Sequence, residues 1–176
     1  MQETVEQYIA RIRSFIGNND PVQSLAKTTD ALRSTLQGVP GDLIKTRPAP
    51  SKWSILEQVA HLSDVEIAVG YRVRIILGSD DGVPIQAFDQ DRWQQEFHYD
   101  DRDLEPMLAA FTAARENNVR FYRSLTEAQW NKYGMHAERG KETVRDIIVL
   151  QAGHDLNHLK QIREILSQKS IAGSSR

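Results

Sequence analysis

Two histidines four residues apart, His154 and His158, stand in the stretch GHDLNHLKQI near the end of the chain. In a helix this spacing places both imidazoles on one face, roughly 40° apart at about 100° per residue. Buried imidazoles need partners for their ring nitrogens, and one divalent metal ion can satisfy two of them at this spacing. Alternatively, the two rings face a polar layer and hydrogen-bond to neighbouring side chains, which is the commoner explanation of an isolated H-x-x-x-H. The motif therefore indicates either a metal site or a polar core.

A third histidine, His61, lies in the segment WSILEQVAHLSDVE. It follows the expected helix N-cap Ser54 by about two turns, and His158 precedes the end of its own expected helix by about three turns. If these two helices run antiparallel, the histidines lie at similar heights, although His61 flanks the apolar stripe of its helix. Three neutral imidazoles leave a coordination position open, which is typical of catalytic metal sites.

The sequence contains no cysteine, which excludes a thiolate metal ligand, a disulfide and a cysteine nucleophile. Any metal must therefore be bound by His, Asp or Glu, and any sulfur nucleophile must come from a second substrate. A phosphate-binding glycine loop and the H-E-x-x-H motif of zinc proteases are also absent from the sequence. An open metal site supports either hydrolysis by an activated water or transfer of a metal-activated thiol.

Two charged residues near the histidines are weaker catalytic candidates. Asp155 follows His154 and either orients that ring or faces solvent. Arg72 projects from nearly the same side of its helix as His61, about three turns and roughly 16 Å further along. Its guanidinium either binds a carboxylate of the substrate or forms an ordinary ion pair.

The long segment from Gly78 to Asp103 supplies further candidates, because a loop of this length is usually functional or covers a site. Asp89 and Trp93 are candidates for covering the site and contacting substrate, although Trp93 could equally anchor the loop. His98 and His136 also lie in expected loops, where histidines are mostly exposed, and we leave them out of the ligand set.

Helical periodicity dominates the chain and strand patterns are almost absent, which predicts an all-α fold. Apolar residues recur at spacings of three and four in five stretches: residues 4–16, 22–36, 54–78, 104–125 and 142–168. The first two can act as one interrupted helix, which leaves four main helices and predicts a four-helix bundle with a crossover or long loop. Ser54 and Glu57 match a capping box, which explains Glu57 better than an interaction with His61 does.

The composition predicts an ordinary soluble domain. The chain has 176 residues, of which 40% are hydrophobic and 26% charged, and its formal net charge is −2. This charge predicts no attraction to nucleic acid or to an anionic membrane. The start of the sequence lacks the apolar core of a signal peptide, so a cytoplasmic location is expected. We expect residues 1–168 to form a single domain and residues 169–176 to be a frayed tail.

The segments around His61, His154 and His158 together resemble the DinB/YfiT-like superfamily of metal-binding four-helix bundles. The stretches AFDQDRW and HAERGKETVRDII are closest to its YfiT branch, and the resemblance spans essentially the whole chain. It implies up-down-down-up connectivity, one divalent ion, nickel or zinc, on the three histidines, and frequent homodimers. The related enzymes of ergothioneine synthesis have an H-x-E ending; Leu159 and Lys160 follow His158 here, so their iron chemistry is not expected.

The resemblance implies three possible functions. Some members of the superfamily transfer low-molecular-weight thiols such as bacillithiol, one group isomerises maleylpyruvate with mycothiol, and others are described as hydrolases. We therefore expect a metal-dependent thiol S-transferase acting on a small thiol and an electrophile. The alternatives are a metal-dependent hydrolase with a small hydrolysable substrate, and a bundle that binds a metal or ligand without catalysis. The preference rests on analogy, because no residue of the sequence specifies sulfur chemistry.

Overall fold

The computed structural model describes residues 3–173, and the side chains of residues 3–168. Its helices are α1 (Val5–Ile16), α2 (Pro21–Leu36), α3 (Gly41–Lys45), α4 (Ile55–Leu77), α5 (Gln90–Glu96), the short 3-10 helix η1 (Tyr99–Asp101), α6 (Leu104–Arg123), α7 (Glu127–Asn131) and α8 (Val144–Gly173). Its strands are β1 (Val83–Ile85), β2 (Tyr133–His136) and β3 (Gly140–Thr143).

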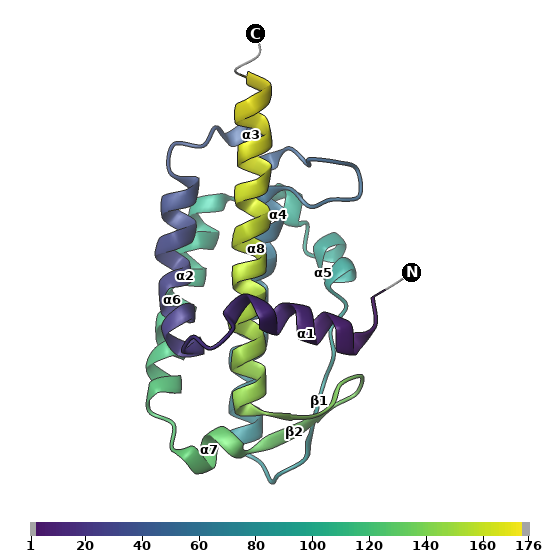
Figure 1. The fold of residues 1–176 in the computed structure, drawn as a ribbon, viewed down its shortest axis with the longest axis vertical. Helices are drawn as coiled ribbons and strands as arrows, with labels where there is room; N and C mark the ends of the chain where they lie inside the picture. Colours follow the sequence, from purple (N-terminus) through teal and green to yellow (C-terminus); the bar gives the residue numbers. More distant parts are fainter. Residues whose placement is uncertain (1–2, 174–176) are drawn as a thin grey trace.

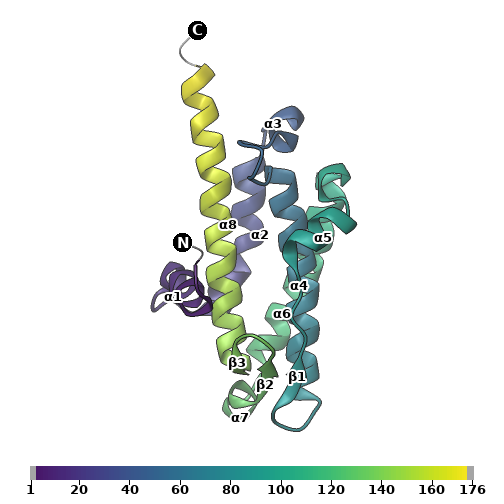
Figure 2. The ribbon, with the colours of Figure 1, turned by 90° about the vertical axis from the view of Figure 1, so that its right-hand side faces the viewer.

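Four helices, α2, α4, α6 and α8, form the predicted bundle. Figures 1 and 2 show α2 and α8 running from the lower end of the molecule to the upper end, whereas α4 and α6 run downward. This is the expected up-down-down-up connectivity. The segment between α4 and α6 carries the chain from the bottom of the bundle back to its top, so that two consecutive helices can lie parallel. As a result α4 and α8 pack antiparallel, as a site shared by their histidines requires.

The N-terminal helix α1 differs from the expectation that it continues into α2. Figure 1 shows α1 lying across α8, nearly at right angles to the bundle. Gly17, which ends α1, has a φ of 54°, a conformation that turns the chain sharply and that glycine adopts without strain. The direction of α2 is then set by a new cap, in which the Asp20 carboxylate accepts hydrogen bonds from the N–H groups of Val22 and Gln23.

A small sheet at the lower end of the bundle was missed by the sequence patterns (Figure 2). Strand β2 lies between β1, to which it is parallel, and β3, to which it is antiparallel. The strands have only three or four residues each, too few to show an alternating pattern. Gly134 is required in β2, since a Cβ there would lie 2.4 Å from the Cγ1 atom of Ile85.

The core is divided by a buried polar layer. One apolar cluster fills the upper part of the bundle and includes Leu62, Phe111 and Leu159, and the other fills the lower part and includes Val69, Val119 and Ile148. Between them along α4, α6 and α8 lie buried polar side chains: Glu66, Arg115, Asn118, Gln151 and Asp155. Buried polar groups are tolerated only with partners, so this layer must form a network.

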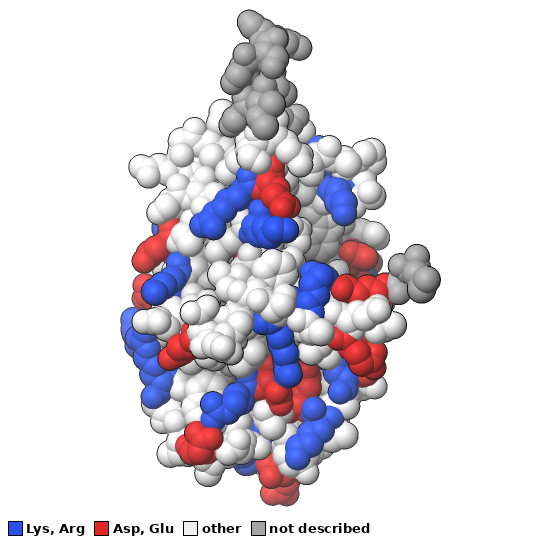
Figure 3. All heavy atoms as spheres, viewed as in Figure 1, with Lys and Arg blue, Asp and Glu red and all other residues white. Residues whose placement is uncertain are grey.

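The last helix is longer than predicted. Its backbone is helical from Val144 to Gly173, past the expected end at Gln168 and into the segment expected to fray. Residues 174–176 of that predicted tail lie outside the described residues. None of the helices within residues 3–173 combines the length and the apolar character needed to cross a membrane. On the face seen in Figure 3, acidic and basic side chains alternate and neither sign forms a continuous patch.

The close packing of α1 on α8 generates a stability prediction at Gly153. A Cβ at this position would lie 2.2 Å from the backbone oxygen of Ile12, so α1 would have to move. Alanine normally stabilises a helix interior relative to glycine by about 1 kcal/mol. We expect Gly153→Ala instead to destabilise the protein by about 1–3 kcal/mol in urea unfolding, because of overpacking.

Gly41→Ala serves as the control, since a Cβ at Gly41 meets nothing within 4 Å. It should leave the unfolding midpoint unchanged or raise it slightly. A Gly153→Ala protein as stable as the Gly41→Ala protein would contradict the tight contact between α1 and α8.

Candidate metal centre

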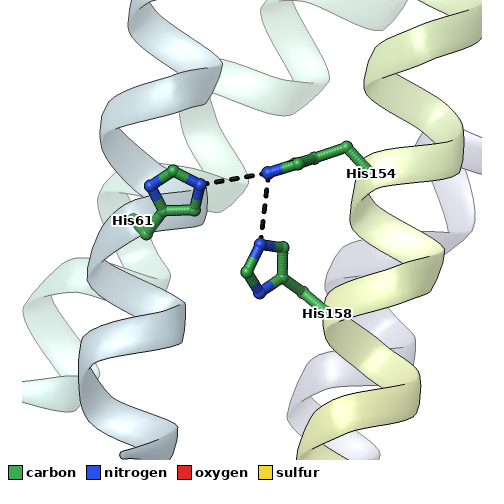
Figure 4. Close-up of side chains that lie close together, drawn as sticks. All are labelled: His61, His154 and His158. Carbon is green, nitrogen blue, oxygen red and sulfur yellow. Dashed lines mark hydrogen bonds between the residues drawn. The ribbon is translucent and has the colours of Figure 1, made fainter. Parts of the chain in front are cut away.

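The three histidines converge on one point between α4 and α8 (Figure 4). His154 Nε2 lies 3.0 Å from His61 Nε2 and 3.1 Å from His158 Nε2. One ring nitrogen from each of the three histidines lies within 4.8 Å of the other two. His61 and His154 are 93 positions apart in the sequence, and the antiparallel packing of α4 and α8 brings them together.

This convergence fits a metal ion better than it fits hydrogen bonding. A ring nitrogen carries either one N–H or one lone pair, so His154 Nε2 cannot form two well-directed hydrogen bonds at once. A tetrahedral ion with metal–nitrogen bonds of about 2.0–2.1 Å places its ligand nitrogens roughly 3.3 Å apart. The two distances of 3.0 and 3.1 Å are close to that value. The donor set therefore suits a first-row divalent metal ion.

A glutamine orients the ring of His158. Its Nδ1 lies 3.1 Å from Gln58 Oε1, an acceptor, so Nδ1 carries the proton and Nε2 presents its lone pair to the other histidines. Gln58 and His158 are both buried. Because a metal-binding imidazole needs a free lone pair on the coordinating nitrogen, this hydrogen bond prepares His158 for metal binding.

Burial keeps two of the imidazoles neutral. It lowers the pKa of His61 well below its usual value, and the charge of His154 lowers it further. Burial also lowers the pKa of His158 well below its usual value, and the charges of His154 and His61 lower it further. Neutral imidazoles are the form that binds metal, so both rings are available as ligands at neutral pH.

The start of α4 holds His61 in place. The Ser54 hydroxyl accepts from the Glu57 N–H at 3.2 Å, and the Glu57 carboxylate accepts from the Ser54 N–H at 2.7 Å, which is the predicted capping box. Arg47 also donates to the buried Glu57 carboxylate, whose contacts therefore belong to the cap. The Trp53 ring lies edge-on to His61, with 5.0 Å between ring centroids.

A buried ion network lies behind His154. Asp155 Oδ1 is 3.8 Å from His154 Nδ1, and Asp155 Oδ2 is 2.7 Å from Arg115 Nη1. Arg115 Nε donates to Glu66 Oε2 at 2.8 Å, and Gln151 donates to the same oxygen at 2.7 Å. Burial acts to raise the pKa of Asp155, but the charges and hydrogen bonds of Arg115 and His154 together outweigh burial and hold that pKa below its usual value. Two carboxylates and one guanidinium thus give the layer a formal charge of −1, which favours a cation at the histidines.

Glu66 and Arg115 were not among the predicted site residues, although their positions carried a signal. Glu66 stands between Leu62 and Val69 in the apolar stripe of its helix, and Arg115 follows Phe111 by four residues in the stripe of α6. A charged residue at a core-facing position needs a buried partner. One acidic and one basic residue of this kind, on two different helices, could have predicted the pair.

The histidines open onto a cavity of about 480 Å³. It lies between α1, α4, α8 and the β2–β3 hairpin, and its walls include these side chains: Tyr8, His61, Arg72, Phe88, His136, Arg139, Glu142, Gln151 and His154. His158 is not in its wall, so His61 and His154 form the accessible side of the triad. A substrate in this cavity would meet the open side of a bound ion.

The predicted substrate-binding residues lie around two adjacent cavities. Arg72 lies in the wall of both the metal cavity and a neighbouring cavity of about 1050 Å³, whereas Asp89 and Trp93 line only the neighbouring one. Asp89 caps α5 by accepting from two N–H groups of its first turn, and Trp93 stacks on Phe88 with 4.3 Å between centroids. Both side chains therefore organise the segment between α4 and α6. Asp155 was expected either to orient His154 or to face solvent. It is buried, so the solvent-facing alternative is wrong.

The expectation that His136 is exposed is wrong. It lies in β2 with 3% of its surface exposed, because the hairpin folds over the metal cavity. Its Nδ1 accepts from the backbone N–H groups of Glu138 and Arg139 at 3.2 and 3.4 Å. Burial, followed by the charge of Arg139, lowers its pKa. His98, in contrast, is exposed as expected.

The comparison with known families agrees with this geometry. The sequence profile of the DinB superfamily matches residues 24–162, which include α4, the bulk of α8 and all three histidines. The chain belongs to the DinB superfamily. The predicted resemblance to the DinB/YfiT-like proteins is therefore confirmed.

Similar proteins are known from several bacteria. Two carry the name "Putative metal-dependent hydrolase": one from Oceanobacillus iheyensis is 25% identical over 81% of this chain and 81% of its own length, and one from Geobacillus thermodenitrificans is 23% identical over 95% of this chain and 86% of its own length. The solved structure of YfiT from Bacillus subtilis, described as "a probable metal-dependent hydrolase with an unusual four-helix bundle topology", covers 97% of this chain and 91% of its own, with a TM-score of 0.79 and 18% identity. That structure confirms the predicted bundle fold.

The buried network yields a stability prediction. Arg115→Met would leave the buried Glu66 and Asp155 without their shared cation. Removing one partner of a buried ion pair typically costs about 3–5 kcal/mol, and we expect a loss of this size in urea unfolding. Arg120→Met on the same helix removes an exposed pair with Glu116 and should change stability by less than about 0.5 kcal/mol. Equal losses in the two variants would contradict the role of Arg115.

The lowered pKa values of His61 and His158 predict how stability depends on pH. Below about pH 6.5 the unfolded chain protonates these imidazoles while the folded protein keeps them neutral. The free energy of unfolding of the metal-free protein should therefore fall as the pH drops from about 7 to 5, by up to about 1.4 kcal/mol per pH unit for each ring. Urea unfolding in EDTA at several pH values measures this slope.

His61→Gln should flatten that slope by removing one of the two groups. His98→Gln, at an exposed histidine outside the cavity, should leave it unchanged. A wild-type slope that His61→Gln does not reduce would show that burial does not hold this imidazole neutral.

Proposed function

We propose that this protein is a divalent-metal-dependent enzyme in which His61, His154 and His158 hold one ion, nickel or zinc, at the wall of the cavity. The observation that carries the proposal is the position of His154 Nε2, at 3.0 and 3.1 Å from the two other Nε2 atoms. The names of the relatives from O. iheyensis and G. thermodenitrificans support metal dependence. When bound, such an ion supplies Lewis acidity that lowers the pKa of a water or thiol at its open position.

The residues around the histidines orient and shield the rings, and they leave the cavity side of the site free for a substrate. Gln58 sets the tautomer of His158, and Asp155 lies against the outer nitrogen of His154. Trp53 lies close to His61 and stacks on His158 at 6.5 Å between centroids, which shields these rings from water. The access that remains is from the cavity, where His61 and His154 are part of the wall.

The reaction that these surroundings favour is transfer of a small thiol to an electrophile. The buried carboxylates around the triad are each engaged by an arginine: Glu57 by Arg47, Glu66 and Asp155 by Arg115, and Glu142 by Arg139. A carboxylate held in this way is a poor general base for activating water. A thiol, with a pKa of about 8.5, ionises more readily than water and depends less on such a base. Because the chain has no cysteine, the thiol would be a cosubstrate.

Hydrolysis is the second candidate, and the relatives' names favour it. It needs the same three histidines and the same cavity, but a water as the nucleophile. A third possibility, a bundle that binds a metal or ligand without catalysis, is consistent with the same ligand set. The three functions differ in which substrates, if any, the protein consumes. The homodimer implied by the family resemblance stays a prediction, which light scattering can test.

Turnover measurements on metal-loaded protein separate these candidates. We expect consumption of at least one of bacillithiol, mycothiol, glutathione or coenzyme A with monochlorobimane or another electrophile. The rate should fall by about 100-fold or more in His158→Ala, since loss of a ligand exceeds the effect of losing an outer partner. His98→Ala, at an exposed histidine outside the cavity, should keep full activity.

The contrary outcomes are equally specific. Hydrolysis of an ester, amide or phosphate substrate without any consumption of thiol would show that the protein is a hydrolase and not a transferase. Inactivity in both panels at full metal occupancy would leave the non-catalytic bundle. Thiol transfer that His158→Ala retains would contradict the metal site as the place of reaction.

A further inference from the structure

Arg72 is a buried cation without a counter-ion. It is 8% exposed, and its Nη2 donates to the backbone oxygen of Gln86 at 2.7 Å. Its Cζ lies 5.6 Å from the centroid of the Phe88 ring. No ion pair within residues 3–168 includes Arg72, and its Nε and Nη1 donate to no acceptor there. Arginines with so little exposure are almost always paired, so this one is prepared for an anion from outside the chain.

The other charges around the cavity do not supply that anion. Arg139 and Glu142 form a two-bond pair, with Nε–Oε1 at 2.7 Å and Nη2–Oε2 at 3.0 Å. Glu3, at the mouth of the cavity, pairs with Arg11 at 2.8 Å, and Glu138 is exposed to solvent. Within the described walls of the cavity, Arg72 is therefore the one buried charge left uncompensated.

His136 offers a second donor beside Arg72. Because its Nδ1 accepts from two backbone N–H groups, the neutral ring carries its proton on Nε2. That Nε2 has no partner among the side chains and backbone of the described residues. The two residues lie close enough for the charge of Arg72 to lower the pKa of His136. Both line the cavity that contains His61 and His154.

We propose that Arg72 and His136 form an anion subsite that binds a carboxylate of the substrate, while the reacting group of that substrate lies at the histidine triad. The inference rests on the proposed function for the identity of the reacting end, but not for the subsite itself. A single uncompensated guanidinium and a neutral N–H match a monoanionic carboxylate better than a dianionic phosphate, and the planar fork of arginine suits carboxylate geometry.

The position of the subsite also defines the shape of the substrate. Arg72 and His61 are separated along α4 by eleven residues, which corresponds to roughly 16 Å of helix rise. The carboxylate and the reacting group are therefore several bonds apart. The β2–β3 hairpin, which carries His136, then acts as the part of the fold that selects substrates by their charged end.

An NMR titration of the metal-free protein with sodium acetate tests the subsite directly, with sodium chloride keeping the ionic strength constant. We expect saturable shifts of the Arg72 Nε–H and His136 ring signals. Affinity should fall by about tenfold or more in Arg72→Gln and by several-fold in His136→Phe, because charge-assisted hydrogen bonds are lost. Arg92→Gln is the control, because Arg92 is an exposed arginine that lines only the neighbouring cavity. Inorganic phosphate should bind more weakly than acetate.

Each contrary result overturns a defined part of the proposal. No saturable shift with acetate, or equal affinity in wild type and Arg72→Gln, would remove the subsite. Tighter binding of phosphate would remove carboxylate as its ligand. If circular dichroism shows that Arg72→Gln does not fold, Arg72→Lys replaces it; this variant keeps the charge without the fork and should bind acetate more weakly, whereas unchanged affinity would overturn the proposed recognition.

The titration uses neither metal nor turnover, so its outcome is independent of the proposed enzyme function. Acetate binding in a protein that proves inactive would leave the subsite in place and count against the enzyme alone. Turnover without acetate binding would count against the subsite alone.

Discussion

The guanidinium of Arg115 connects all four helices of the bundle. From α6 it contacts Glu66 on α4, Asp155 on α8 and the backbone oxygen of Leu25 on α2. Such a buried charge is tolerated only when every partner is in place, so this one contact set fixes the relative positions of the helices. Since Asp155 also lies against His154, the same interaction positions the candidate metal ligands.

The chain path builds the site around this layer in two steps. The long connection between α4 and α6 makes α4 antiparallel to α8, which brings His61 to the height of His154 and His158 (Figures 1 and 4). Helix α1 and the β2–β3 hairpin then cover the exposed side and form the cavity. Gly153, directly before His154, permits the close approach of α1. The cavity therefore depends on elements at both ends of the sequence.

Much of the fold and the histidine triad could be predicted because they depend on local rules. Helical periodicity identified the four bundle helices, and the capping box at Ser54 located the start of α4. The spacing of His154 and His158, with His61 in an antiparallel partner, was enough to bring three imidazoles together. The charged residues Glu66 and Arg115 follow the same periodicity, so their core-facing positions also predict a buried pair.

The remaining features depend on tertiary contacts that periodicity does not report. The direction of α1 follows from a sharp turn at Gly17 and from its seat on α8, and the sheet consists of strands too short to show a pattern. His136 is buried because the β2–β3 hairpin folds over the cavity, and Asp89 and Trp93 lie beside a neighbouring cavity because of the path of the segment between α4 and α6. The positions of such short elements in connecting segments are set by tertiary contacts more than by local sequence.

We infer that His61, His154 and His158 hold one divalent ion. X-ray absorption spectroscopy of untagged protein, with metal content determined by inductively coupled plasma mass spectrometry, tests it most directly. We expect about one nickel or zinc ion per chain, coordinated by three imidazole nitrogens at roughly 2.0–2.1 Å, and loss of the ion in His61→Ala and His154→Ala. A wild-type protein that takes up no metal from an excess of either ion, or whose bound metal survives both substitutions, would contradict it.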